Sequence, residues 1–166
     1  MRNPSRRRGR IDGAAREALR SAGAGRVVAW ATDGSGGVVV ATVAELAVVD
    51  AGGAISLTPW HEVLSGRWVA DEDALVVTTV DGQQRMLAVD EDSGLLEALR
   101  ERVQTSVVTS ESLARGRTFV AIRQDLTTRA LLEQVVRSGR LVPEDRRSPE
   151  EQEMLATLRE RIGAPA

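Results

Sequence analysis

The chain has 166 residues and a mass of 17.9 kDa, a length that predicts one domain with a hydrophobic core large enough to fold without disulfides or metals. It contains no cysteine, which excludes disulfides, thiol catalysis and thiolate metal sites. Its apolar runs are shorter than the roughly 20 residues of a membrane helix, and none follows the basic N-terminus as in a signal peptide. We therefore expect a soluble, cytoplasmic protein without a transmembrane segment.

Charge is divided unevenly along the chain. Residues 1–26 carry eight arginines against two acids, a net charge of +6, whereas the remaining 140 residues carry 14 arginines against 22 acids, a net charge of −8. All 22 basic residues are arginine, a bias typical of GC-rich genomes. The sequence thus predicts a basic arm attached to an acidic body.

The N-terminal arm, residues 1–24, divides into a polar tail and a short helix. The segment MRNPSRRRGR has no apolar face, which is typical of a solvated, disordered tail. From Ile11 to Ala22 apolar residues recur at helical spacing, and the small, flexible segment SAGAG ends the pattern. We expect a short, weakly amphipathic helix here.

Residues 25–104 show strand signals at short spacing. Seven antiparallel strands are predicted: VVAWAT (27–32), VVVATV (38–43), ELAVVD (45–50), AISLT (54–58), RWVAD (67–71), ALVVTTV (74–80) and QRMLAV (84–89). Asp81-Gly82, between two alternating runs, is a strong hairpin signal. Such short, closely spaced strands indicate a small barrel or sandwich, since an open sheet of this size would leave unpaired edges.

A helix is expected directly after these strands, in DSGLLEALRERV (92–103). Leu95, Leu96, Leu99 and Val103 share one face, and acidic residues precede the first turn, where they complement the helix dipole. We expect this helix to plug one end of the barrel.

Seven strands followed by one amphipathic helix, with Thr58-Pro59-Trp60 leading into the fifth strand, resemble the pleckstrin-homology-like (PH-like) domain of small bacterial proteins. The resemblance covers about residues 27–103 and contains no catalytic motif. It implies an α+β fold and a module that binds phosphoinositides, peptides or partner proteins.

Residues 105–166 extend beyond such a domain. The segments 106–113 and 118–124 predict a hairpin, while 128–136 fits either a helix or a third strand, and its β-branched end favours the strand. Ser148 and Glu151 form a capping box at the start of a C-terminal helix. The extension is therefore expected to contain three strands covered by a helix.

His61, beside Trp60, is the first residue to test for catalysis. A serine hydrolase would need a nucleophile elbow of the GxSxG type, which is absent, and one histidine without cysteines cannot build a zinc site. The acidic clusters Asp71–Asp73 and Asp90–Asp92 fit turns and a helix start better than a calcium loop. We predict no catalytic residue, metal or cofactor, and expect His61 partly exposed at a strand end.

Two sets of residues are candidates for binding. Trp60 and His61 lie near the expected open end of the barrel, where an exposed tryptophan can anchor a partner or a peptide can add to a strand edge. We expect Trp30 and Trp68 in the core instead. The second set consists of the tail arginines Arg6, Arg7, Arg8 and Arg10. Guanidinium groups bind phosphates, so this set predicts weak contact with nucleic acid or anionic lipid.

The sequence favours a non-enzymatic protein-binding or adaptor module whose protein partner and oligomeric state it does not identify. Attachment to a phosphate surface through the arginine tail is the alternative. An enzyme built on carboxylates is a third hypothesis, for which the sequence offers no converging set of residues.

Overall fold

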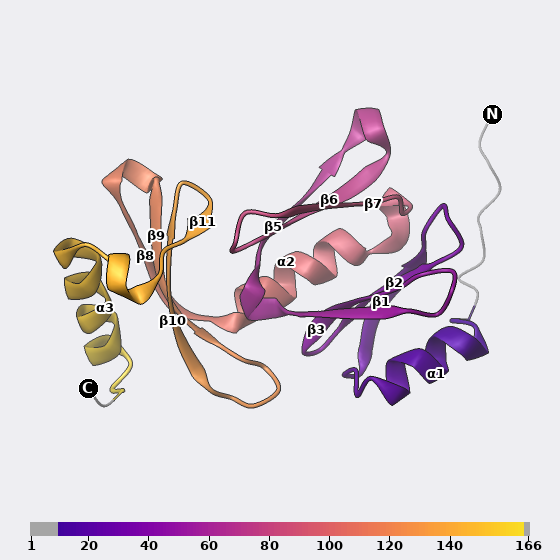
Figure 1. The fold of residues 1–166 in the computed structure, drawn as a ribbon, viewed down its shortest axis with the longest axis horizontal. Helices are drawn as coiled ribbons and strands as arrows, with labels where there is room; N and C mark the ends of the chain where they lie inside the picture. The colour runs from indigo at the N-terminus through magenta and orange to yellow at the C-terminus, as the bar shows by residue number, and fades with distance from the viewer. Residues whose placement is uncertain (1–9, 165–166) are drawn as a thin grey trace.

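A computed structural model describes residues 10–164 as three α-helices and eleven β-strands (Figure 1). The strands form three antiparallel sheets, with the orders β1-β2-β3-β4, β5-β6-β7 and β11-β10-β9-β8. The predicted α+β class and the predominance of antiparallel strands are therefore confirmed. Of the tail residues 1–10, which we expect to be disordered, residues 1–9 lie outside the described residues.

The first sheet follows the predicted hairpins closely. It consists of β1 (Val27–Thr32), β2 (Val38–Thr42), β3 (Glu45–Val49) and β4 (Ile55–Pro59). The turn between β1 and β2 is held by Asp33, whose Oδ1 accepts hydrogen bonds from the backbone N–H groups of Ser35 (2.8 Å) and Gly37 (2.9 Å). Helix α1 (Gly13–Ser21) packs on the outer face of this sheet.

The second sheet contains the predicted Asp81-Gly82 hairpin. Its strands are β5 (Val63–Val69), β6 (Ala74–Thr79) and β7 (Gln84–Leu87), and Gly82 has the positive φ of 84° that the turn requires. Strand β5 begins at Val63 and not at Arg67, because Val63 already pairs with Thr79 of β6.

Helix α2 (Leu95–Ser106) lies between the first two sheets (Figure 1). Its buried residues Leu95, Ala98 and Leu99 share one core with inward-facing residues of both sheets. Helix and strand lie close together at Gly66 of β5, where an added Cβ would lie 2.6 Å from a methyl carbon of Leu99. Glycine is thus needed there to let the helix contact the strand.

The prediction is a barrel or a sandwich, and the two sheets do not close into a barrel. Within residues 10–164, β1 and β4 are the edges of the first sheet, and β5 and β7 are the edges of the second. The prediction that the helix plugs one end is also wrong, since α2 fills the space between the sheets. There its leucine face is buried against both sheets, which removes its apolar area from water.

The C-terminal extension forms the third sheet and its covering helix. The elements are β8 (Val107–Leu113), β9 (Thr118–Gln124), β10 (Leu131–Arg137), β11 (Arg140–Leu141) and α3 (Pro149–Arg161). The predicted third strand is confirmed, because β10 pairs along its whole length with β9. The short β11 is a fourth strand that the sequence analysis missed. The capping box of Ser148 and Glu151 is present as predicted.

The third sheet packs against the turn between β4 and β5. Arg123 of β9 is 1% exposed and donates hydrogen bonds to the backbone oxygens of Trp60 (2.6 Å) and Val63 (2.9 Å). The side-chain amide of Gln134 in β10 donates to His61 O (2.7 Å). The extension therefore covers the region that the sequence analysis expected to be an open end.

Candidate functional site

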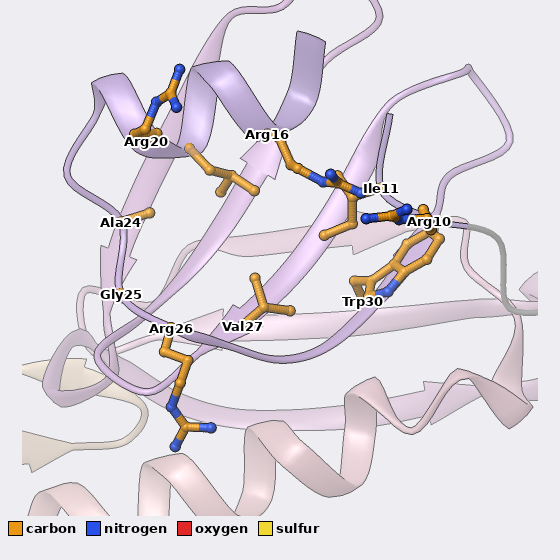
Figure 2. A pocket seen from close by; sticks show the side chains of 10 residues that line it. Arg10, Ile11, Arg16, Arg20, Ala24, Gly25, Arg26, Val27 and Trp30 are labelled. Carbon is orange, nitrogen blue, oxygen red and sulfur yellow. The ribbon is translucent and has the colours of Figure 1, made fainter. Parts of the chain in front are cut away.

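A groove of about 590 Å³, called the arginine groove below, lies between α1 and β1 (Figure 2). Four arginines line it, namely Arg10, Arg16, Arg20 and Arg26. Its apolar part is formed by Ile11, Leu19, Ala24, Val27 and Trp30. The groove therefore offers positive charge and apolar surface to the same ligand.

Helix α1 brings two of the arginines to the groove. Its N-terminus is capped by Asp12, whose Oδ1 accepts a hydrogen bond from the N–H of Ala15 (2.7 Å). Ala15 and Leu19, four positions apart, are buried against the first sheet. Arg16 and Arg20 each follow one of these residues, so the buried stripe places both guanidinium groups on the flank of the helix.

A buried carboxylate fixes the connection from α1 to β1. Gly23, with a φ of 71°, ends the helix, and the N–H of Gly25 then donates to Oε1 of Glu45 (2.6 Å). The Thr42 hydroxyl donates to the same oxygen (2.6 Å), and Glu45 is buried. Glu45 thus holds the connection in place just before Arg26 and the start of β1.

The positive charge of the groove is only partly neutralised within the protein. Arg20 forms an ion pair with Glu17, whereas Arg10, Arg16 and Arg26 have no ion-pair partner among residues 10–164. In Figure 2 the side chains of Arg10 and Arg16 extend toward one another at the Trp30 end of the groove. The side chains of Arg20 and Arg26 point away from that end. The Trp30 end therefore presents two converging cations beside an indole ring.

The tail arginines of the sequence analysis are only partly represented in this site. Arg10 lines the groove, whereas Arg6, Arg7 and Arg8 lie outside the described residues. The sequence analysis did not name Arg16 or Arg26, and it expected Trp30 in the core and not at a binding site. The available signal was the charge of +6 over residues 1–26, which includes both arginines.

The structure does not support Trp60 and His61 as an exposed interaction site. They lie in the 3₁₀ turn Trp60–Glu62, where Trp60 is 0% exposed and its Nε1 donates to Thr42 O (2.9 Å). His61 is 9% exposed, so the prediction of a partly exposed strand-end histidine is wrong. The reason is tertiary, because the third sheet packs over this turn through Arg123. Trp30 and Trp68, predicted in the core, are half-buried at its margin.

Burial of His61 changes its protonation. Removal from water lowers the pKa of His61 below its ordinary value of 6.5, and the negative charges of Asp125 and Glu62 oppose the shift only in part. Its Nδ1 is buried and has no hydrogen-bond partner among the described residues. The neutral imidazole is therefore the favoured form in this position.

A second cavity, of about 610 Å³, lies between the tips of the third sheet and the start of α3. Its charges are compensated to a greater extent than those of the arginine groove. Arg137, which lines it, donates two hydrogen bonds of 2.7 Å to the carboxylate of Glu151, and Glu150 lines the same cavity. We therefore regard the arginine groove as the candidate functional site.

Comparison with known proteins found no relative, since no family model, curated protein or solved structure matches the chain. In residues 10–164, no three side chains of histidine, aspartate or glutamate are grouped closely enough to hold a metal ion. None of the described helices is long and apolar enough to cross a membrane.

Proposed function

We propose that this protein is a cytoplasmic, non-enzymatic binding module that docks an acidic segment of a partner protein in the arginine groove. The observation that carries the proposal is the presence of Arg10 and Arg16, without counter-ions among the described residues, beside an apolar surface. Guanidinium groups bind carboxylates through paired hydrogen bonds. The methylene groups of those acidic side chains would be buried against Ile11, Leu19 and Trp30, as apolar atoms are in the core of an ordinary protein interface.

We also infer that the first two sheets and α2 form a PH-like arrangement. Support comes from the order of four strands, three strands and one helix, with the helix packed between the sheets. Because one fold carries many functions, the proposal of binding depends on the groove and not on this likeness.

A short acidic protein segment fits the groove better than an extended polyanion. Residues 27–166 carry a net charge of −8, which repels a nucleic acid or an anionic membrane that extends past the groove. A protein segment confines its negative charge to a few residues and also supplies apolar groups. The mixed lining of the groove matches that composition.

The test uses a blocked peptide of about eight alternating glutamate and valine residues, long enough to span a strand. Its affinity is measured for the wild-type protein and for the double variant Arg10→Glu, Arg16→Glu. We expect the variant to bind at least about tenfold more weakly, a loss of about 1.4 kcal/mol or more.

A matched control makes the same charge change elsewhere. Arg100→Glu with Arg115→Glu alters two exposed arginines outside the groove, and we expect its affinity to stay within about twofold of the wild type at moderate ionic strength. Equal weakening in both double variants would show that only overall charge matters. Absence of peptide binding to the wild type would also contradict the proposal.

A phosphate-surface binder is the second candidate, because Arg10 connects the arginine tail directly to the groove. It predicts that replacing Arg6, Arg7 and Arg8 with glutamine weakens binding to a duplex oligonucleotide or to phosphatidylserine vesicles. Binding of this kind falls steeply with salt. Peptide docking in the groove depends instead on Arg10 and Arg16.

A further inference from the structure

The open side of β1 borders the arginine groove. Strand β1 pairs with β2 and has no strand on its other side among the described residues. Val27 and Val28 are 37% and 42% exposed. The open stretch ends at the hairpin, where the N–H of Gly34 donates to Ala88 O (3.0 Å).

Two residues of β1 direct their backbone groups outward. The N–H of Asp33 donates to Gly37 O (3.0 Å), which makes this a hydrogen-bonded pair of the hairpin. Hydrogen-bonded and non-bonded pairs alternate along antiparallel strands, so Ala31 faces β2, whereas Trp30 and Thr32 point their N–H and C=O groups away from it. These groups have no backbone partner elsewhere in residues 10–164.

The edge of β1 lacks the protection that the other described edge strands have. Edge strands normally carry charged residues or proline, which oppose pairing with other chains. Pro59 lies in β4, Arg67 in β5, Arg85 in β7, Glu111 in β8 and Arg140 in β11. Strand β1, VVAWAT, has neither a charge nor a proline. An edge of this composition is suited to accept another strand.

We propose that β1 receives the extended acidic segment of the partner as a fifth strand of the first sheet. The inference rests on the proposed function, since the arginine groove supplies the charge that selects an acidic strand. Trp30 lies on the face packed against α1, so alternate side chains of the added strand would meet Arg10 and Arg16 there. The intervening side chains would lie on the face where Ala31 packs into the α2 core. A segment that alternates acidic and apolar residues satisfies both faces.

Other occupants fit this edge less well. A second copy of the chain pairing through β1 would bring two sets of groove arginines together, and like charges at an interface oppose association. Nucleic acids and lipids lack the peptide groups that could pair with Trp30 and Thr32. An acidic peptide strand supplies both the charge and the backbone hydrogen bonds.

The decisive experiment compares the glutamate–valine peptide with two isomers that are N-methylated either at every glutamate or at every valine. Both isomers keep all side-chain charges, but each loses the N–H donors on one edge of the peptide strand. We expect one isomer to bind full-length protein at least about tenfold more weakly and the other to retain the affinity of the unmethylated peptide, because an added strand uses one of its two edges.

Each result has a distinct meaning. If the unmethylated peptide binds and both isomers retain its affinity, or both lose it equally, strand addition is overturned while docking in the groove stands. If the unmethylated peptide does not bind, the proposed function fails as well.

Hydrogen exchange of the backbone amides provides the second readout. Saturation with the unmethylated peptide should slow exchange of the Trp30 and Thr32 amides on the open edge of β1. Unchanged exchange under saturation would overturn the inference. The inference would also be overturned if a duplex oligonucleotide or a phosphatidylserine vesicle bound more tightly than the unmethylated peptide and left both amides unprotected. The groove would then be a phosphate site.

Discussion

Replacement of Arg123 by methionine tests how the third sheet is attached to the rest of the protein. Arg123 is a buried cation with no carboxylate partner among the described residues. Burial lowers its pKa to about 10, so the guanidinium remains charged at neutral pH. Methionine retains much of the apolar stem and removes both the charge and the donors. We expect Arg123→Met to destabilise the protein by about 2–4 kcal/mol.

The magnitude follows from three of the four acceptors that Arg123 contacts, since the fourth, Val103 O, lies at 3.5 Å. It donates to Trp60 O at 2.6 Å, Val63 O at 2.9 Å and Ser106 Oγ at 3.1 Å. A hydrogen bond from a charged donor contributes about 1.5–3 kcal/mol, and the replacement removes three of them. Trp60 O still accepts from the Val63 N–H, and the Ser106 hydroxyl still donates to Val103 O. Removing a buried cation recovers several kcal/mol of its desolvation cost, which offsets about half of that loss.

Urea unfolding and thermal unfolding measure the effect. For a chain of this size each kcal/mol shifts the Tm by about 2–4 °C, so we expect a decrease of roughly 5–15 °C. Arg100→Met is the matched control, because Arg100 is exposed on α2 and its replacement should change the free energy of unfolding by less than about 0.5 kcal/mol. An Arg123→Met variant as stable as the wild type would refute the reasoning, since desolvation would then cancel the hydrogen bonds completely.

Three further predictions concern the core and the groove. His61 has a lowered pKa in the folded state, so the unfolded chain binds its proton more tightly, and the free energy of unfolding should fall as pH drops below 6.5. The variant His61→Gln should lose this component of the pH dependence, and identical curves for both proteins would contradict the assignment. Gly66→Ala places a methyl group 2.6 Å from Leu99 and should destabilise the protein by about 1–3 kcal/mol in urea unfolding. Gly13→Ala, where an added Cβ meets nothing within 4 Å, is its control, and equal stability of the two variants would rule out the contact. Glu45→Ala removes the acceptor of the Gly25 N–H and should cost about 1–3 kcal/mol. It should also speed hydrogen exchange at Gly25, whereas unchanged exchange would show that another group holds the α1–β1 connection.

Local structure was predictable wherever one short-range pattern dominated. Alternating β-branched runs and glycine turns located the first four strands to within one residue at each end, and β9 without error. The capping box at Ser148 located the start of α3. Strand β5 was predicted too short, because Gly66 and its neighbours interrupt the alternation, although they pair with β6. The extent of β5 depends on its pairing with β6, and the sequence of a single segment does not show that pairing.

The candidate site was predictable only as a concentration of charge. Counting arginines located the basic arm, and Arg10 belongs to the groove as well as to the tail. The prediction of an exposed site at Trp60 and His61 is wrong, because proximity to a strand end does not show which other element packs over it. The covering residue, Arg123, lies 63 positions from Trp60, and in the sequence it resembles any solvent-facing arginine of an alternating strand.

The sequence by itself determined the α+β class, the succession of short antiparallel strands and the division between a basic arm and an acidic body. These properties depend on alternation, turn residues and composition, which act over a few neighbouring positions. Tertiary structure alone decided that α2 lies between two open sheets, that the third sheet buries Trp60 and that β1 keeps an open edge beside four arginines. The physical reason is that burial and strand pairing depend on which segments, far apart in the sequence, come into contact. The free energy of those contacts depends on the whole chain.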